Sequence, residues 1–355
     1  MSHITISSRR IGPGEPLYFV ADIGANHDGS LDRAYRLIEL AAAAGADAAK
    51  FQNFIAPRIV SRRGFEELDG QLAHQSGWAK SVFEVYEDAS LPEDWTPLLA
   101  QRCRELGIDY FTSPYDLATV DAVDAHVPAF KIGSGDITWL EIVRHIAGKG
   151  KPVLLATGAS DEVDVDRAMA VLREQTDQIV LMQCNTNYTN DPANLRHVNL
   201  SVLARWRDRH PDTVLGLSDH TAGHLTVCAA VALGARVFEK HFTDDTGREG
   251  PDHAFSMTPE SWRAMVDAAN ATDAALGDGV KRVEANEAQA AVVQRRALRF
   301  ARDLPAGHRL GPADLVATRP CPPNGIAPHR VEEVLGRELE AAATADSLVT
   351  PEALA

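Results

Sequence analysis

The stretch Thr213–Thr243, TVLGLSDHTAGHLTVCAAVALGARVFEKHFT, decides the fold of this 355-residue chain. Its apolar start predicts a strand over Thr213–Leu217, and the small residues that follow predict a helix over Gly223–Leu233. A second apolar run predicts another strand over Arg236–Glu239. A strand, a helix and a strand in this order are typical of parallel α/β folds.

A histidine follows each of these two strands, His220 after the first and His241 after the second. The carboxyl ends of parallel strands meet at one opening of the fold, so we expect both imidazoles to face the same place. Two imidazoles can share a divalent metal ion. Each could equally cap a strand end through a backbone hydrogen bond, so the pair alone leaves both interpretations open.

Eight strand-like runs follow a short N-terminal hairpin, which we expect over Ile4–Ile6 and Arg9–Ile11. Most of the runs are short and apolar, which is typical of parallel strands buried on both faces. Eight strand–helix units in roughly 250 residues predict an α/β fold of the (β/α)8 TIM barrel type. A doubly wound sheet is the alternative, but the first strand is not followed by Gly-x-Gly-x-x-Gly. The expected strands are Leu17–Ile23, Ala48–Gln52, Asp109–Thr112, Ala129–Ile132, Val153–Ala156, Ile179–Gln183, Thr213–Leu217 and Arg236–Glu239.

Two segments lie outside this regular pattern. Ala56–Leu91 is a long insertion with several arginines and aromatic residues, and we expect it to form a lid or a wall of the substrate site. The tail contains short strand patterns at Leu298–Ala301 and Leu315–Thr318 among glycines and prolines, which predicts a small β-rich domain. The expected boundaries are 1–280 for the barrel, 281–296 for a linker and 297–355 for the small domain.

Composition narrows the classes of function. The chain has 35 Lys and Arg against 50 Asp and Glu, and the net charge of −15 disfavours non-specific binding to nucleic acid or to an anionic membrane. We find no apolar signal segment and no run long enough to cross a membrane. The four cysteines are scattered without a Cys-x-x-Cys pair, so we expect a reducing, cytoplasmic setting.

Polar residues gather where the expected strands end. Lys50, Lys131 and Lys240 come from three different strands. Three like charges at one end of a barrel repel each other unless an anion or a carboxylate offsets them. Hydroxyl groups and glycines follow the same strands, and hydroxyls with exposed backbone N–H groups suit a phosphate or carboxylate ligand. The sequence therefore predicts an anion-binding site at the carboxyl end of the barrel.

Six motifs at these strand ends resemble, in the same order, those of the sialic acid synthase (N-acetylneuraminate synthase) family. That family condenses phosphoenolpyruvate with N-acetylmannosamine or a related sugar, and it joins a TIM barrel to a C-terminal antifreeze-protein-like (SAF) domain. The resemblance extends from residue 17 to about residue 340, and in the tail it includes Arg319-Pro320 and Asn324-Gly325. The six motifs are Ala21-Asp22-Ile23-Gly24-Ala25-Asn26-His27-Asp28-Gly29, Ala49-Lys50-Phe51-Gln52, Lys131-Ile132-Gly133-Ser134-Gly135, Gly216-Leu217-Ser218-Asp219-His220-Thr221, Glu239-Lys240-His241-Phe242 and Gly250-Pro251-Asp252-His253.

The resemblance implies roles for particular residues. His220 and His241 would hold a divalent ion, with Mn²⁺ expected before Mg²⁺ or Co²⁺. Asp136 and Asp22 would be the catalytic carboxylates, and each stands where the family has Glu. The expected ligands of phosphoenolpyruvate are Lys50, Gln52, Ser113, Lys131, Ser134 and Ser218, and those of the sugar are Asp22, Tyr188 and Arg319.

The resemblance also implies a domain-swapped homodimer, because the family arginine matched by Arg319 reaches the barrel of a partner subunit. Three other readings stay open. Another metal-dependent barrel enzyme would leave Lys131, Ser134 and Ser218 unexplained. A non-catalytic carbohydrate-binding protein would have no need for the paired histidines. The third keeps the chemistry but changes the acceptor to a diacetamido-trideoxy sugar of the legionaminic or pseudaminic type, or to a sugar of a specialised pathway.

Overall fold

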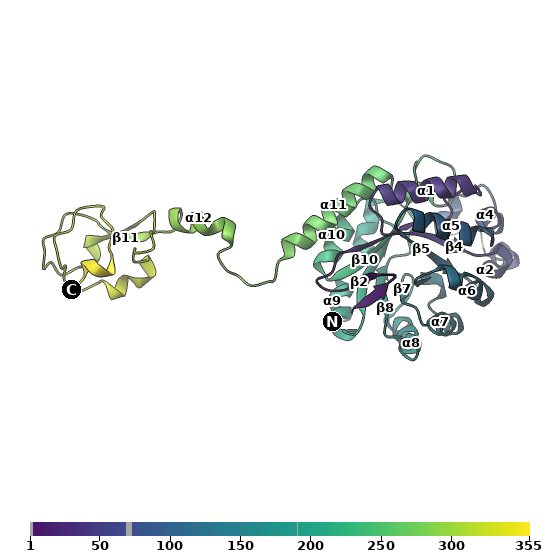
Figure 1. Ribbon diagram of the computed structural model, residues 1–355, viewed down its shortest axis with the longest axis horizontal. Helices are drawn as coiled ribbons and strands as arrows, with labels where there is room; N and C mark the ends of the chain where they lie inside the picture. The colour runs from purple at the N-terminus through teal and green to yellow at the C-terminus, as the bar shows by residue number, and fades with distance from the viewer. Residues whose placement is uncertain (1–2, 69–72, 190) are drawn as a thin grey trace. The chain divides into compact units, whose positions relative to one another are not determined.

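The computed structural model describes residues 3–68, 73–189 and 191–355. The chain forms two compact units, Met1–Gly277 and Asp278–Ala355 (Figure 1). The domain boundaries expected at residues 280 and 296 stay a prediction. Within the described residues, no helix is long and apolar enough to span a membrane.

The first unit is a nearly closed barrel of eight parallel strands, so the predicted TIM barrel is confirmed. The strand order is β5-β4-β3-β10-β9-β8-β7-β6, and β5 and β6 at the two ends of this order also contact each other. The strands are buried along almost their whole length, which explains their apolar sequences. Their bounds are Tyr18–Asp22 (β3), Ala48–Asn53 (β4), Asp109–Pro114 (β5), Phe130–Ile132 (β6), Val153–Ala156 (β7), Ile179–Cys184 (β8), Val214–Asp219 (β9) and Ala235–His241 (β10).

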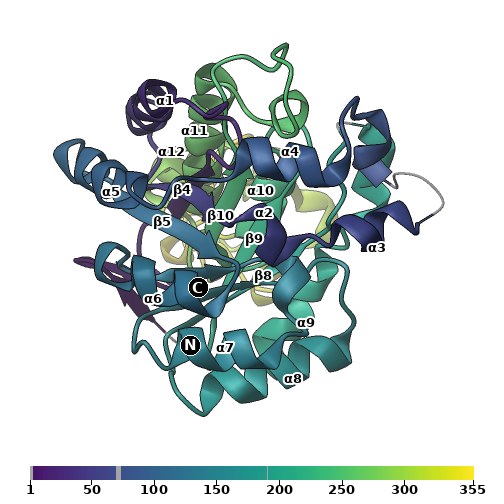
Figure 2. The same ribbon diagram turned by 90° about the vertical axis from the view of Figure 1, so that its right-hand side faces the viewer.

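Helices surround the strands (Figure 2). At the start of α1 the hydroxyl of Ser30 accepts a hydrogen bond from the N–H of Arg33, at 3.3 Å. Pro259 opens α11, and Gly277 follows its last turn with a φ of +61°. The apolar faces of the helices pack on outward-facing strand residues in the main hydrophobic core. The helix bounds are Leu31–Ala43 (α1), Trp95–Glu105 (α5), Leu117–Val123 (α6), Leu140–Ala147 (α7), Glu162–Arg173 (α8), Ser201–Arg209 (α9), Leu225–Ala232 (α10) and Pro259–Leu276 (α11).

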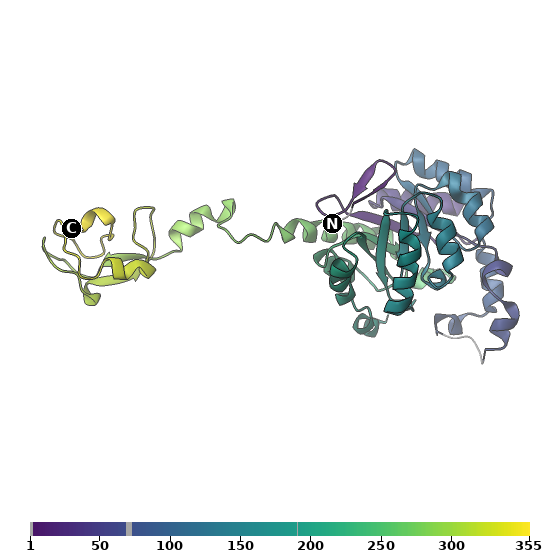
Figure 3. The same cartoon turned by 90° about the horizontal axis from the view of Figure 1, so that it is seen from below.

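The N-terminal hairpin closes the amino end of the barrel. Its strands β1 (Ile4–Ile6) and β2 (Arg9–Ile11) are antiparallel, as the sequence predicts. The three isoleucines of the hairpin pack in one buried cluster with residues near the starts of the barrel strands, among them Tyr18 and Ala48. Figure 3 shows the hairpin at one end of the barrel. The carboxyl end is therefore the open one.

The insertion after β4, for which the sequence predicts no secondary structure, is helical. It contains α2 (Ala56–Ile59), α3 (Arg62–Glu66), a 3-10 helix (Ala73–Gly77) and α4 (Val82–Ala89). Its aliphatic and aromatic side chains form a small core of their own around Val82. These short helices lie in front of the strands in Figure 2 and opposite the hairpin in Figure 3. The insertion therefore covers part of the carboxyl end of the barrel.

The second unit is small and contains little regular structure. Its strands β11 (Ala297–Phe300) and β12 (Leu315–Thr318) pair in antiparallel fashion around a core that includes Leu298 and Phe300. A short helix, α12 (Ala288–Val293), lies in the segment expected to be the linker. This antiparallel pair confirms the two short strands that the sequence predicts in the tail.

Candidate active site

Strand register brings the central side chains of the site together. His241 pairs with Asp22 between β10 and β3, and Asp22 pairs with Lys50 between β3 and β4. Residues paired in register point to the same face of a sheet, so these three side chains face the barrel interior at one level. Glu239 and Ser218 pair between β10 and β9 and also face the interior.

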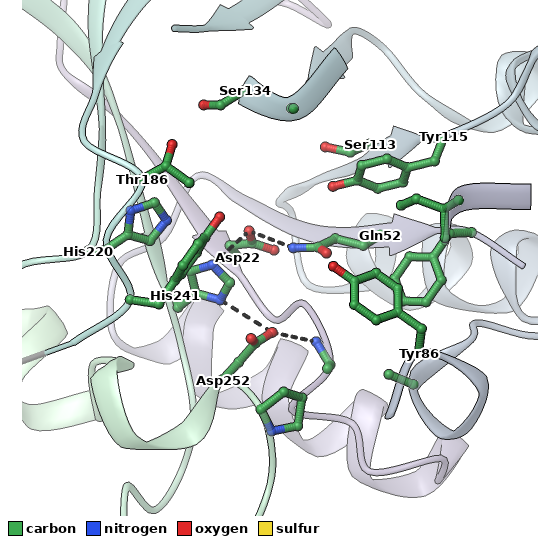
Figure 4. A pocket seen from close by; sticks show the side chains of 18 of the residues that line it. Asp22, Gln52, Tyr86, Ser113, Tyr115, Ser134, Thr186, His220, His241 and Asp252 are labelled. Atoms are coloured by element: carbon green, nitrogen blue, oxygen red, sulfur yellow. Dashed lines mark hydrogen bonds and ion pairs between the residues drawn. The ribbon is translucent and has the colours of Figure 1, made fainter. Parts of the chain in front are cut away.

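A cavity of about 470 Å³ opens at this end of the barrel (Figure 4). It brings together every site residue that the sequence predicts in the barrel. Arg319 instead lies in the second unit, where it is exposed just after β12. The predicted residues that line the cavity are Asp22, Lys50, Gln52, Ser113, Lys131, Ser134, Asp136, Tyr188, Ser218, His220 and His241.

Four charged side chains form a buried network in this cavity. The Nζ atom of Lys50 lies 2.6 Å from Asp22 Oδ2 and 3.6 Å from Glu239 Oε1. The Nζ atom of Lys131 lies 3.4 Å from the same oxygen of Glu239. Burial alone would raise the pKa of the Asp22 carboxyl, but the positive charges of Lys50, His241 and Lys131 outweigh it and lower that pKa. An arriving anion therefore meets two ammonium groups that are already held in place.

Four buried polar atoms around the cavity have no hydrogen-bond partner in the described structure. They are Ser113 Oγ, Asp22 Oδ1, Glu239 Oε2 and His241 Nδ1. An unsatisfied buried polar group costs about 1–3 kcal/mol, and native proteins contain few of them. These four atoms leave hydrogen-bonding capacity for a ligand in the cavity.

The two predicted metal ligands lie side by side, with ring centroids 5.5 Å apart. His220 Nδ1 lies 3.1 Å from the carbonyl oxygen of Asn185. A carbonyl only accepts, so this nitrogen carries a proton, and in the neutral form of the ring the lone pair lies on Nε2. The ring of His241 lies between two carboxylates, 3.5 Å from Asp22 Oδ2 and 3.6 Å from Asp252 Oδ2. Imidazole nitrogens beside carboxylate oxygens suit a divalent ion, so these residues fit the expected metal.

Asp136 lies in a 3-10 turn, Ser134–Asp136, that follows β6. Burial raises the pKa of its carboxyl to about 6, although the positive charge of Lys131 opposes the shift. The N–H of Gly158 donates to Ser134 Oγ at 2.9 Å and fixes this turn against the next strand end. A carboxyl group that titrates near neutral pH is suited to proton transfer.

Lys240 does not belong to the site, and the expectation that it joins Lys50 and Lys131 there is wrong. Successive residues of a strand point to opposite faces, so Lys240 points outward while its neighbours on both sides point inward. Its Nζ pairs with the carboxylate of Asp219 and donates to the carbonyl oxygen of Thr221 at 2.6 Å. The strand also ends later than expected, because His241 is the last residue of β10.

The profile of the NeuB family matches residues 37–281, and that of the SAF domain matches residues 295–355. The chain belongs to the NeuB family. It is 35% identical over 284 residues to the spore coat polysaccharide biosynthesis protein SpsE of Bacillus subtilis, covering 79% of this chain and 74% of that protein. It is 33% identical over 334 residues to the N,N'-diacetyllegionaminic acid synthase of Legionella pneumophila, covering 92% of each.

A solved structure agrees with this assignment. The N-acetylneuraminic acid synthetase of Leptospira borgpetersenii serovar Hardjo-bovis, crystallised with citrate, superposes with a TM-score of 0.71 at 26% identity. The similarity covers 81% of this chain and 95% of that one. This member of the NeuB family is accordingly an enzyme, a synthase of the transferase type, and its predicted SAF domain is confirmed.

The NeuB-family barrel places further residues in the cavity for which the sequence suggested no role. Glu239 joins the two lysines, and Asp252 accepts from the N–H of Ala25 at 3.0 Å beside His241. Gly24 explains part of the first motif, because a Cβ there would lie 2.6 Å from Asp252 Oδ2. Glu239 and Asp252 both occur in the six motifs quoted above, and this position in the motifs was the sequence signal that could have identified them as site residues. Tyr86, Tyr115 and Thr186 also line the cavity.

His253 shows how Asp252 is held in place. Its side chain is fully buried, with Nε2 2.8 Å from Asp28 Oδ1 and Nδ1 2.7 Å from Thr243 Oγ1. Asp28 also accepts from Arg248 at 2.7 Å. These contacts fix the loop after β10 to the loop after β3.

One other cluster in the described part of the chain has the composition of a metal site. Glu162, Asp166 and His210 bring potential ligand atoms within 4.8 Å of one another. Arg209 pairs with both carboxylates, and His210 Nδ1 lies 3.1 Å from a guanidinium nitrogen of Arg173. These residues belong to the outer helices and do not line the cavity. Ion pairs with Arg209 offset the two carboxylates, but Glu162 Oε1 and the buried His210 Nε2 have no hydrogen-bond partner in the described structure.

Proposed function

We propose that the protein condenses phosphoenolpyruvate with an N-acyl amino sugar and releases a nonulosonic acid and phosphate. N-acetylmannosamine is one acceptor, and a diacetamido-trideoxy hexose of the legionaminic or pseudaminic type is the alternative. Membership of the NeuB family supports the reaction. The observation that carries the proposal is the position of Lys50 and Lys131, both buried and both beside polar atoms without partners.

Phosphoenolpyruvate fits the charged half of the cavity. Its phosphate and carboxylate would lie against Lys50 and Lys131, whose side chains are 2% and 3% exposed. Ser113, with its unpartnered hydroxyl, would add a hydrogen bond. Gln52, Ser134 and Ser218 complete the proposed set of ligands. Holding both substrates in one cavity makes a two-substrate step effectively intramolecular.

The proposed reaction forms one carbon–carbon bond and one carbon–oxygen bond, and it breaks the carbon–oxygen bond to the phosphate. The methylene carbon of phosphoenolpyruvate attacks the aldehyde carbon of the sugar, and the aldehyde oxygen takes up a proton. Water then adds to the resulting cationic centre and loses a proton, and phosphate leaves with its bridging oxygen. Asp136 would move a proton or orient this water, because its raised pKa lets it change charge near neutral pH. Asp22 and Tyr188 would position the sugar.

His220 and His241 would hold a divalent ion, for which we propose Mn²⁺. When bound, such an ion supplies Lewis-acid polarisation of the sugar carbonyl. Asp22 and Asp252 flank His241 and would fix the orientation of its ring.

The proposal extends to assembly and location. Arg319 would contact the sugar in the barrel of a second copy, which makes a domain-swapped homodimer. A guanidinium suits an acyl carbonyl or a hydroxyl oxygen. The four free cysteines support a cytoplasmic setting.

The test is product formation in water labelled with ¹⁸O. We expect the label to appear in the new acid and not in the released phosphate, because water attacks carbon. Label in the phosphate would mean attack at phosphorus and would contradict the proposed reaction. As a control, the Lys131→Met variant should release little phosphate with any sugar.

A further inference from the structure

Gly158 occupies a point where side chains from two other strand ends converge. It follows β7, is buried and does not line the cavity itself. A Cβ atom at this position would collide with Thr186 Oγ1 and would lie 3.0 Å from both Ser134 Oγ and Cys184 Sγ. Gly158 is not one of the glycines with a positive φ, so its backbone conformation does not call for glycine. The missing side chain instead leaves space for these three polar atoms.

The backbone around Gly158 is held in place on both sides. The Thr157 hydroxyl donates to the carbonyl oxygen of Met182 at 2.9 Å, and this contact ties the end of β7 to β8. The Ser160 hydroxyl donates to the carbonyl oxygen of Gly158 at 3.1 Å. A backbone fixed in this way resists displacement, so the side chains opposite would have to move if a methyl group were added at Gly158.

The N–H of Gly158 sets the direction of the Ser134 hydroxyl. It donates to Ser134 Oγ at 2.9 Å, so this oxygen already accepts one hydrogen bond. A hydroxyl has a single proton to donate, and accepting from an N–H leaves that proton for another oxygen. An anionic oxygen in the cavity only accepts and is therefore suited to take it. Ser134 also begins the 3-10 turn that contains Asp136, so the same contact holds this turn.

Thr186 and Cys184 approach Gly158 from the end of β8. Cys184 pairs with Ser218 in the register of β8 and β9, and both residues line the cavity. Cys184 Sγ lies 3.9 Å from Thr186 Oγ1. Figure 4 shows Thr186 and Ser134 on the same side of the cavity, and both converge on Gly158. Gly158 is thus the common contact of the turn after β6 and the end of β8.

We propose that Gly158 is a positioning residue for phosphoenolpyruvate. Its N–H orients the Ser134 hydroxyl toward the anion, and its missing side chain lets Ser134 and Thr186 meet beside that anion. The inference rests on the proposed condensation, in which Ser134 is a ligand of phosphoenolpyruvate. A methyl group at Gly158 would displace both hydroxyls from the positions they hold at the cavity.

The experiment measures binding of phosphoenolpyruvate to the full-length, Mn²⁺-loaded protein by isothermal titration calorimetry, together with KM for both substrates and the melting temperature. Gly158→Ala should weaken phosphoenolpyruvate binding at least about tenfold, because a hydrogen bond to an anion is misplaced. It should change KM for the sugar less than about threefold. Gly148→Ala is the matched control, since Gly148 has a φ of −65° and a Cβ there would lie an ordinary 3.4 Å from the carbonyl oxygen of Arg144. This control should bind phosphoenolpyruvate as the wild type does.

Thr186→Ala supplies a second background, because it removes the atom nearest to the added methyl group. Gly158→Ala should weaken phosphoenolpyruvate binding at least about threefold less in this background than in the wild type. Equal effects in the two backgrounds, unchanged phosphoenolpyruvate binding by Gly158→Ala, or failure to fold in both backgrounds would overturn the inference and leave the condensation standing. Absence of phosphoenolpyruvate binding by the wild-type protein would overturn both.

Discussion

Replacing Asp219 by Asn should destabilise the barrel while sparing its chemistry. Asp219 and Lys240 are 3% and 1% exposed, and they face away from the cavity. Removing one charge of a buried pair costs about 3–5 kcal/mol, because the other charge loses its partner. Lys240 keeps its hydrogen bond to the carbonyl oxygen of Thr221, so we expect the lower end, about 3 kcal/mol. For a domain of this size that corresponds to a fall in melting temperature of roughly 6–12 °C.

Thermal unfolding by circular dichroism measures this loss, and initial rates at 25 °C measure activity. We expect kcat/KM of Asp219→Asn to change by less than about threefold, or about 0.6 kcal/mol. Asp22→Asn is the matched control, because it makes the same chemical change inside the cavity. It should lose activity at least about 100-fold and lose less stability, since Lys50 keeps Glu239 at 3.6 Å. A stable Asp219→Asn protein, or one as inactive as Asp22→Asn, would refute the reasoning from strand alternation.

Three other predictions concern the site. The pKa of Asp136 is raised to about 6 by burial, so kcat/KM should rise with pH through about 6 as the carboxylate forms, and a pH profile of Asp136→Asn should lack this limb. A limb that persists in the variant would assign it to another group. His241→Ala should lower turnover at least about 1,000-fold and remove bound metal measured by mass spectrometry, with a nearly unchanged melting temperature. Full turnover in the presence of a strong chelator would contradict the metal assignment. Arg319→Ala should raise KM for the sugar about tenfold and leave KM for phosphoenolpyruvate unchanged. Unchanged sugar kinetics would remove Arg319 from the site.

The barrel could be predicted from sequence because its signals are local. Apolar runs between helical patterns mark strands buried on both faces, and the residues after them must meet at one end. This logic alone brings Lys50, Lys131 and His220 to one cavity. The prediction was wrong for Lys240. The expected strand ended at Glu239 and left Lys240 in the loop, but β10 continues to His241, so Lys240 is a strand residue whose side chain faces the helices.

Contacts between distant segments could not be predicted in the same way. Asp252 reaches His241 because Gly24 leaves room for its carboxylate, and no local pattern reports this. Asp136 shares the cavity with Tyr86 and Tyr115, which come from other parts of the chain, and its burial there raises its pKa. The helices of the insertion are short and irregularly spaced, and their small core is visible only once they have packed.

The most direct test of the account is release of phosphate from phosphoenolpyruvate in the presence of Mn²⁺, with each candidate sugar supplied in turn. The account predicts release that depends on one sugar and a product whose mass equals that sugar plus pyruvic acid. Release without a sugar, or no release from a folded, metal-loaded protein with any N-acyl sugar, would contradict it.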